Sequence, residues 1–165
     1  MTRLQTLTDE FARETAVARR HLERIPEDHL DWRPHPKSLA AGDLGGHLAE
    51  CVRWAEYVFS ADGLDVDPAA YVSLRPGSHA DLLDTFDAQV QAALHAMRQS
   101  DDPDADAPWR MRLRGETLFE KPREAAFRDL SLSHLVHHRG QLTVYLRRLD
   151  VPLVGTYGPT ADEQP

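Results

Sequence analysis

Two histidines four residues apart, His134 and His138, are the residues of this sequence best placed to do chemistry. They lie in residues 129–146, whose pattern predicts a helix. Four residues are about one helical turn, so both imidazoles project from the same face. That face also carries apolar side chains, and two imidazoles in such a place either bind a metal ion or form hydrogen bonds inside the core. The pair alone does not separate these alternatives.

Amphipathic helices must position these histidines, and four segments have the required apolar periodicity. The helices are expected at residues 4–25, 38–58, 78–97 and 122–149. Ser38 and Ser78 are the expected N-caps of the second and third. The inner face of the last helix is expected to comprise Phe127, Leu130, His134, His138, Gln141, Tyr145 and Leu149. Residues 109–120 alternate in a way that predicts a short hairpin or extended segment. The expected fold class is therefore all-α, a four-helix bundle forming a single domain over residues 1–165.

A third histidine, His47, falls within the apolar stripe of the second helix. Gly45 and Gly46 precede it, and each glycine costs a helix about 1 kcal/mol relative to alanine. Close approach of a neighbouring helix, or room for a ligand, would explain the pair; a tolerated weak point is the alternative. Together with the pair on the last helix, His47 completes three neutral imidazoles, which can hold a catalytic metal ion and leave one position open.

Other polar residues near these positions could take part in the site, but each can also be explained without a function. His137 is the closest rival to His138 but lies further off the stripe. Glu50 can orient a ligand imidazole or form a surface ion pair. Arg53 and Arg139 can hold an anion, although solvated side chains are expected, and Cys51 is expected to be a buried, inert thiol. Solvated side chains are also expected for His21, His29, His35, His79 and His95.

Composition narrows the class of protein. Nineteen Lys and Arg residues against 27 Asp and Glu give a net charge of −8, which disfavours a nucleic-acid partner. The start of the chain has no apolar signal-peptide core, and no stretch approaches the ~20 apolar residues of a membrane span. A single cysteine excludes an intrachain disulfide. A cytoplasmic protein with no membrane partner is expected.

Three motifs taken together resemble the DinB-like superfamily, including its YfiT group. These are S-L-A-A-G-D-L-G-G-H-L-A-E from Ser38, H-L-V-H-H-R-G-Q from His134, and Y-G-P-T-A-D-E from Tyr157, with Thr160 where the family pattern has Ser. The resemblance implies a four-helix bundle with crossover connections, often dimeric. It also implies a metal triad of one histidine on the second helix and two on the fourth, here His47, His134 and His138.

The resemblance further implies a divalent metal cofactor, with Zn or Ni expected and Mn or Fe as alternatives. Relatives include S-transferases that use bacillithiol, mycothiol or glutathione, so a metal-dependent thiol S-transferase acting on a small thiol and an electrophile is expected. A metal-dependent hydrolase and a non-enzymatic metal-binding stress-response protein are the alternatives. A fourth protein ligand would favour the non-enzymatic protein, because structural sites leave no open position.

Overall fold

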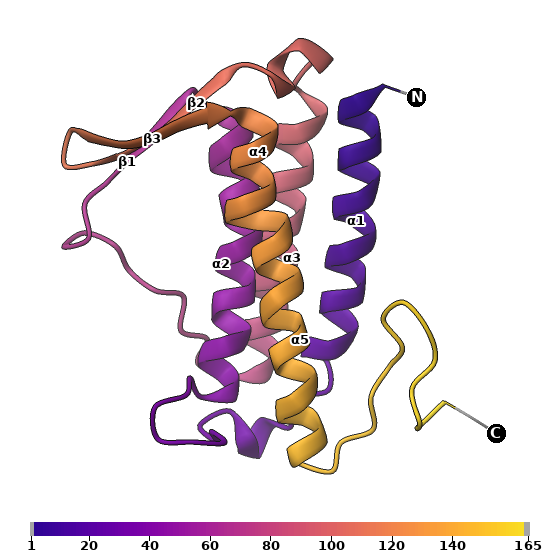
Figure 1. Cartoon of the computed structure of the whole chain (residues 1–165). Helices are drawn as coiled ribbons and strands as arrows, with labels where there is room; N and C mark the ends of the chain where they lie inside the picture. Colours follow the sequence, from indigo (N-terminus) through magenta and orange to yellow (C-terminus); the bar gives the residue numbers. More distant parts are fainter. Residues whose placement is uncertain (1, 164–165) are drawn as a thin grey trace.

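The computed structural model describes residues 2–163 as a helical bundle with a small sheet at one end (Figure 1). Within these residues, the bundle is built from α1 (Arg3–Leu22), α2 (Ala41–Ser60), α3 (His79–Arg98) and a fourth segment that comprises α4 (Arg123–Phe127), a π-helical turn (Arg128–Leu132) and α5 (Ser133–Arg148). None of the helices in the described residues is both long and apolar enough to cross a lipid bilayer. The predicted four-helix bundle is confirmed.

The N-termini of α3 and α2 are capped in different ways, the first by a side chain and the second by backbone carbonyl groups. Ser78 caps α3 as predicted, since its hydroxyl accepts a hydrogen bond of 3.1 Å from a backbone N–H of the first turn. The prediction that Ser38 caps α2 is wrong. The helix begins at Ala41, and the first backbone N–H groups of α2 donate to the carbonyl oxygens of Trp32 and Leu30, each at 2.8 Å. The loop before α2 therefore supplies the acceptors that the sequence analysis assigned to a side chain.

The connection between α2 and α3 is a crossover. Residues 67–78 run along the outside of the bundle from the sheet back to the opposite end, so α2 and α3 point in the same direction (Figure 1). Both α1 and α2 pack against α3 and α5. Consecutive helices are therefore not simply up and down, and the crossover segment is brought alongside α2.

A three-stranded sheet covers the other end of the bundle. Its strands are β1 (Gly63–Val66), β2 (Pro108–Leu113) and β3 (Glu116–Pro122), with β1 parallel and β3 antiparallel to β2. The predicted hairpin is thus present, and it turns at Arg114 and Gly115, which have positive φ angles of 50° and 86°. The expected all-α bundle with one short hairpin is incomplete, because β1 was not predicted. A strand of four residues is too short for its alternation to be recognised.

The π-helical turn corrects the predicted inner face of the last helix. The buried side chains of α5 are Leu135, Arg139, Leu142 and Leu146, which are spaced four, three and four residues apart. By contrast, Gln141 is exposed, and His134 and His138 are only half-buried. A π turn inserts an additional residue and rotates everything after it around the helix axis. The predicted stripe is therefore wrong by one position, and both histidines lie at the edge of the core.

Gly45 and Gly46 allow close approach, as one of the sequence hypotheses stated. A Cβ atom on Gly45 would lie 2.7 Å from Leu82 Cδ2 of α3, and one on Gly46 would lie 2.1 Å from the carbonyl oxygen of Leu74 in the crossover. The first neighbour is the end of a flexible side chain, whereas the second is backbone. Gly46 is therefore the residue that lets residues 67–78 lie against α2.

Gly46→Ala is expected to displace the crossover. The gain in helix propensity, about 1 kcal/mol, is offset because backbone at Leu74 must move. Gly140→Ala is the matched control: a Cβ on Gly140 meets nothing within 4 Å, so this change should stabilise the fold by up to about 1 kcal/mol. Urea unfolding and limited chymotryptic cleavage after the exposed Tyr71 measure both effects. Wild-type cleavage rates in G46A would contradict this account.

His21 corrects another expectation, because it is fully buried rather than solvated. Its Nδ1 lies 2.9 Å from the carbonyl oxygen of Val17. Burial lowers the pKa of His21, and the nearby charge of Arg139 acts in the same direction. The folded protein therefore holds this imidazole in its neutral form.

Acid is expected to weaken the fold partly through His21. Its folded pKa is below the ordinary value of 6.5, so in acid the unfolded chain takes up the proton more readily. The contribution is complete above about pH 6.5 and is lost as the pH falls below it. In His21→Met the fall in unfolding free energy from about pH 7.5 to about pH 5 should be smaller, as measured by urea titration. The exposed His95→Met should retain the wild-type pH dependence, and the same dependence in H21M would refute the assignment.

Candidate metal centre

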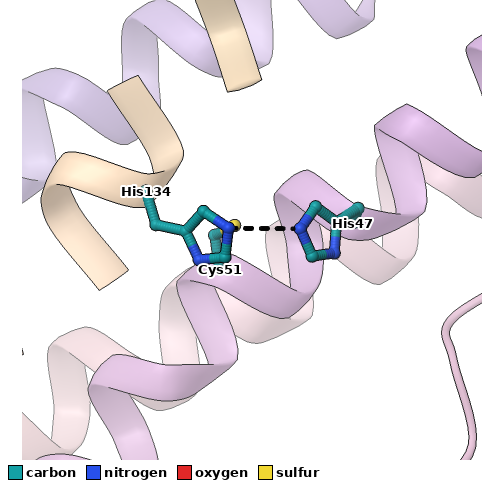
Figure 2. Close-up of side chains that lie close together, drawn as sticks. All are labelled: His47, Cys51 and His134. Carbon is teal, nitrogen blue, oxygen red and sulfur yellow. Dashed lines mark hydrogen bonds between the residues drawn. The ribbon is translucent and has the colours of Figure 1, made fainter. Parts of the chain in front are cut away.

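The structure brings His47, His134 and His138 together between α2 and α5. The Nε2 atoms of His47 and His134 are 3.3 Å apart (Figure 2). The ring centroid of His138 lies 4.5 Å from that of His47 and 4.7 Å from that of His134. The predicted residues thus form one cluster of imidazoles from two separate helices.

Hydrogen bonds determine which nitrogen of two of these rings is free. Nδ1 of His47 is 2.8 Å from Glu50 Oε2, and a carboxylate only accepts, so Nδ1 carries the proton. Nδ1 of His138 is 2.8 Å from Gln141 Oε1 and donates in the same way. In each neutral ring the proton on Nδ1 leaves Nε2 with its lone pair. These partners therefore give both rings the tautomer that binds a metal through Nε2.

The separation of the two Nε2 atoms tests whether an ion fits. Two imidazoles on one tetrahedral Zn²⁺, each with a bond of about 2.0–2.1 Å, have nitrogens roughly 3.3–3.4 Å apart. The Nε2 atoms of His47 and His134 are separated by 3.3 Å. Two ring nitrogens this close repel each other through their lone pairs unless a proton or a cation lies between them. The distance and the donor type therefore fit a divalent ion.

Glu50 links His47 to the crossover segment. Glu50 is 4% exposed, and its second oxygen, Oε1, accepts a hydrogen bond of 2.7 Å from the backbone N–H of Leu74. The alternative of an ordinary surface ion pair is therefore wrong. A carboxylate held by backbone on one side and imidazole on the other fixes the orientation of the His47 ring.

Burial keeps the two histidines of α5 uncharged. Burial and, to a lesser extent, the neighbouring imidazoles of His47 and His134 lower the pKa of His138 to about 4. Burial also lowers the pKa of His134, followed by the charge of His47. Since only a neutral imidazole can bind a metal, both rings are available for binding at neutral pH without first losing a proton.

Cys51 is a candidate ligand that the sequence analysis missed. One donor atom from each of His47, Cys51 and His134 lies within 4.8 Å of the others, so this group can hold a metal ion (Figure 2). Burial and, to a lesser extent, the charge of Glu50 raise the pKa of the Cys51 thiol to about 12. The prediction of a buried thiol is thus confirmed, but its closeness to the histidines was not foreseen. The spacing H-x-x-x-C from His47, one helical turn, is the signal that could have revealed it.

Two hollows open beside the cluster. A small one of about 100 Å³ next to His47 is lined also by Leu39, Asp43, Glu50, Ser73, Leu74 and Arg75. A broader one of about 430 Å³ next to His138 is lined also by Ser38, Leu39, Leu44, Gln141, Val144 and Tyr145. The first is rich in charge, whereas the second is mostly apolar. Leu39 borders both.

Comparison with known proteins identifies the family. The sequence model of the DinB superfamily matches residues 10–142, which are 133 of the 165 residues and include all three clustered histidines. The chain belongs to the DinB superfamily. No curated protein sequence matches this DinB-superfamily chain.

Two solved DinB-like structures are similar to this DinB-superfamily protein in fold. The DinB-like protein YjoA from Bacillus subtilis has a TM-score of 0.72 at 17% identity, covering 93% of this chain and 99% of that one. A DinB-like protein from Bacillus cereus has a TM-score of 0.70 at 19% identity, covering 90% and 94%. The bundle with its crossover and small sheet is therefore a DinB-like fold.

The other polar candidates take different places around the DinB-like site. His137 is exposed, and its ring centroid lies 4.9 Å from that of His138. Arg53 is half-buried, with its guanidinium 5.7 Å from the ring centre of Tyr57. Arg139 is 2% exposed, so the expectation that it is solvated is wrong. It donates hydrogen bonds to Glu14 of α1 rather than to a residue of the cluster.

Proposed function

We propose that this DinB-superfamily protein holds a divalent metal ion through His47, His134 and His138 and transfers a small thiol onto an electrophilic substrate. The observation that carries the proposal is the convergence of neutral imidazoles from two helices, with two Nε2 atoms at a separation suited to one ion. Zn or Ni is the proposed ion, with Mn or Fe as alternatives, because imidazole suits several of these metals.

The chain's own residues prepare the site. Glu50 and Gln141 hold His47 and His138 with Nε2 free, and burial keeps the α5 imidazoles neutral. When bound, an ion with one open position acts as a Lewis acid and lowers the pKa of a thiol or water beside it. The apolar hollow beside His138 would exclude water from an organic substrate.

The two hollows favour transfer between two organic molecules over hydrolysis. In the proposed reaction the thiol sulfur forms a bond to an electrophilic carbon, the leaving group departs with its electron pair, and the thiol proton passes to solvent. Such a reaction needs room for the rest of the thiol on one side of the reacting sulfur and for the electrophile on the other. A hydrolase needs room for only one organic substrate besides water, so the second hollow would have no role.

Cys51 supports a second candidate function, a metal-binding protein without catalysis. Its donor atom lies close to those of His47 and His134, and it would occupy the position that a catalytic site leaves open. A high pKa of the free thiol opposes this role, because a thiol must lose its proton to bind a metal.

Metal analysis of single variants separates the two candidates. His138→Ala is expected to lower divalent-metal affinity by at least about 100-fold, because even the loss of an outer partner costs about 10–100-fold. Cys51→Ala and His137→Ala should keep most of the ion, measured by elemental analysis after dialysis. Loss of metal from C51A with retention in H138A would instead make Cys51 the third ligand. Loss in H137A as complete as in H138A would show that the wrong histidine of the neighbouring pair was chosen.

A further inference from the structure

The hollow beside His47 contains two opposite charges that the fold does not use. Among the described residues, neither the carboxylate of Asp43 nor the guanidinium of Arg75 forms a hydrogen bond or an ion pair with another side chain. They are not paired with each other although both line the same hollow. Glu50, the other charge there, is already occupied by His47 and Leu74.

The two charges come from different elements with different constraints. Asp43 is in the first turn of α2, where a negative charge is favoured by the helix dipole. Arg75 lies in the crossover, next to the segment that Gly46 and Glu50 hold against α2. The hollow is therefore lined by a carboxylate from a rigid helix, Asp43, and by a guanidinium from an anchored loop, Arg75.

We infer that this hollow binds the ammonium and carboxylate groups of a small zwitterionic thiol, with Asp43 and Arg75 as their respective partners. The inference rests on the proposed function, since the sulfur of the same molecule would lie toward the His47 side of the cluster. It assigns the charged hollow to the thiol and the apolar hollow beside His138 to the electrophile.

Size and charge both support an amino-acid type of group. A volume of about 100 Å³ is that of three to four waters, at about 30 Å³ each, so it suits a compact group. A simple anion would bind Arg75 but would be repelled by Asp43 and Glu50. A simple cation would be repelled by Arg75. A group that carries both charges satisfies both side chains, and charge-assisted hydrogen bonds are stronger than neutral ones.

Four small thiols that share a two-carbon thiol unit and differ in the charged groups attached to it test this inference. L-cysteine carries both charges, 3-mercaptopropionate only the negative one, cysteamine only the positive one, and 1-propanethiol neither. Each would be titrated into cobalt(II)-loaded protein, and binding followed by the thiolate-to-cobalt charge-transfer absorption. L-cysteine is expected to bind about tenfold more tightly than either singly charged thiol, the effect of one charge-assisted hydrogen bond. Elemental analysis after each titration verifies that the thiol has not removed the ion.

Two variants assign the preference to its residues. Arg75→Gln should reduce L-cysteine affinity to about that of cysteamine, and Asp43→Asn to about that of 3-mercaptopropionate. The matched controls are Arg13→Gln on α1 and Asp84→Asn on α3, both exposed residues on helices that supply no residue of this hollow. Both controls should keep the wild-type order of affinities.

The outcomes distinguish this inference from the proposed function. Protein that takes up no divalent ion would overturn both. Protein that takes up the ion but binds the four thiols equally, or whose preference survives in R75Q and D43N, would overturn the assignment of the hollow and leave the metal proposal standing.

Discussion

His47→Ala is expected to abolish tight binding of a divalent ion while the bundle still folds. His47 is the only histidine that α2 contributes to the cluster, and its Nε2 is 3.3 Å from that of His134. Without it the remaining imidazoles come from one helix, and affinity should fall by more than about 100-fold, beyond the cost of losing an outer partner. The His47 side chain is 29% exposed, so its truncation removes little of the core.

Elemental analysis after dialysis, with circular dichroism to monitor the fold, provides the measurement. His95→Ala is the matched control, because it removes an exposed histidine from α3. It should keep the wild-type metal content. Undiminished metal in H47A would refute the proposed triad.

Arg139→Met is expected to have the largest effect on stability. The Arg139 guanidinium is buried and donates to Glu14 Oε2 at 2.6 Å and to the hydroxyl of Tyr157 at 2.7 Å. Removing one partner of a buried pair leaves the other charge uncompensated, which costs about 3 kcal/mol or more. Urea unfolding should show a loss of this size. The substitution would also remove one of the contacts between the C-terminal residues and the bundle, the hydrogen bond to Tyr157.

Two further variants test whether the loss of the buried ion pair causes the lower stability of Arg139→Met. Arg148→Met, which removes an exposed arginine at the end of the same helix, should change the unfolding free energy by less than about 0.5 kcal/mol. Adding Glu14→Gln to Arg139→Met should recover part of the loss, because an amide keeps a hydrogen bond to Tyr157 without a stranded charge. A loss in R139M no larger than in R148M would show that the pair contributes nothing.

The helices could be predicted from the sequence because their local signals agree. In residues 78–97 the apolar spacing, the capping residue and the flanking loop all indicate the same element, and in residues 4–25 the apolar spacing alone indicates a helix. The spacing of His134 and His138 is equally local, so their common face could be predicted. The meeting of that face with His47 depended on the resemblance to DinB-like proteins, because periodicity does not say which helices are neighbours.

What could not be predicted depends on contacts between distant segments. The π turn at residues 128–132 has no distinctive residue, yet it moves Arg139 into the core and the histidines to its edge. Arg139 is buried only because Glu14, 125 residues away, supplies a partner. Glu50 is likewise buried because Leu74 and His47 use both of its oxygens.

The bridge that Glu50 makes between His47 and the crossover has a consequence for redesign. Residues 67–78 would be an obvious place to engineer acceptance of new compounds, yet changes there would also alter how the ring at position 47 is held. The contact uses the main chain of Leu74, which nineteen of the twenty amino acids supply equally well. A mutagenesis library over this segment therefore keeps this hydrogen bond with any residue at position 74 except proline.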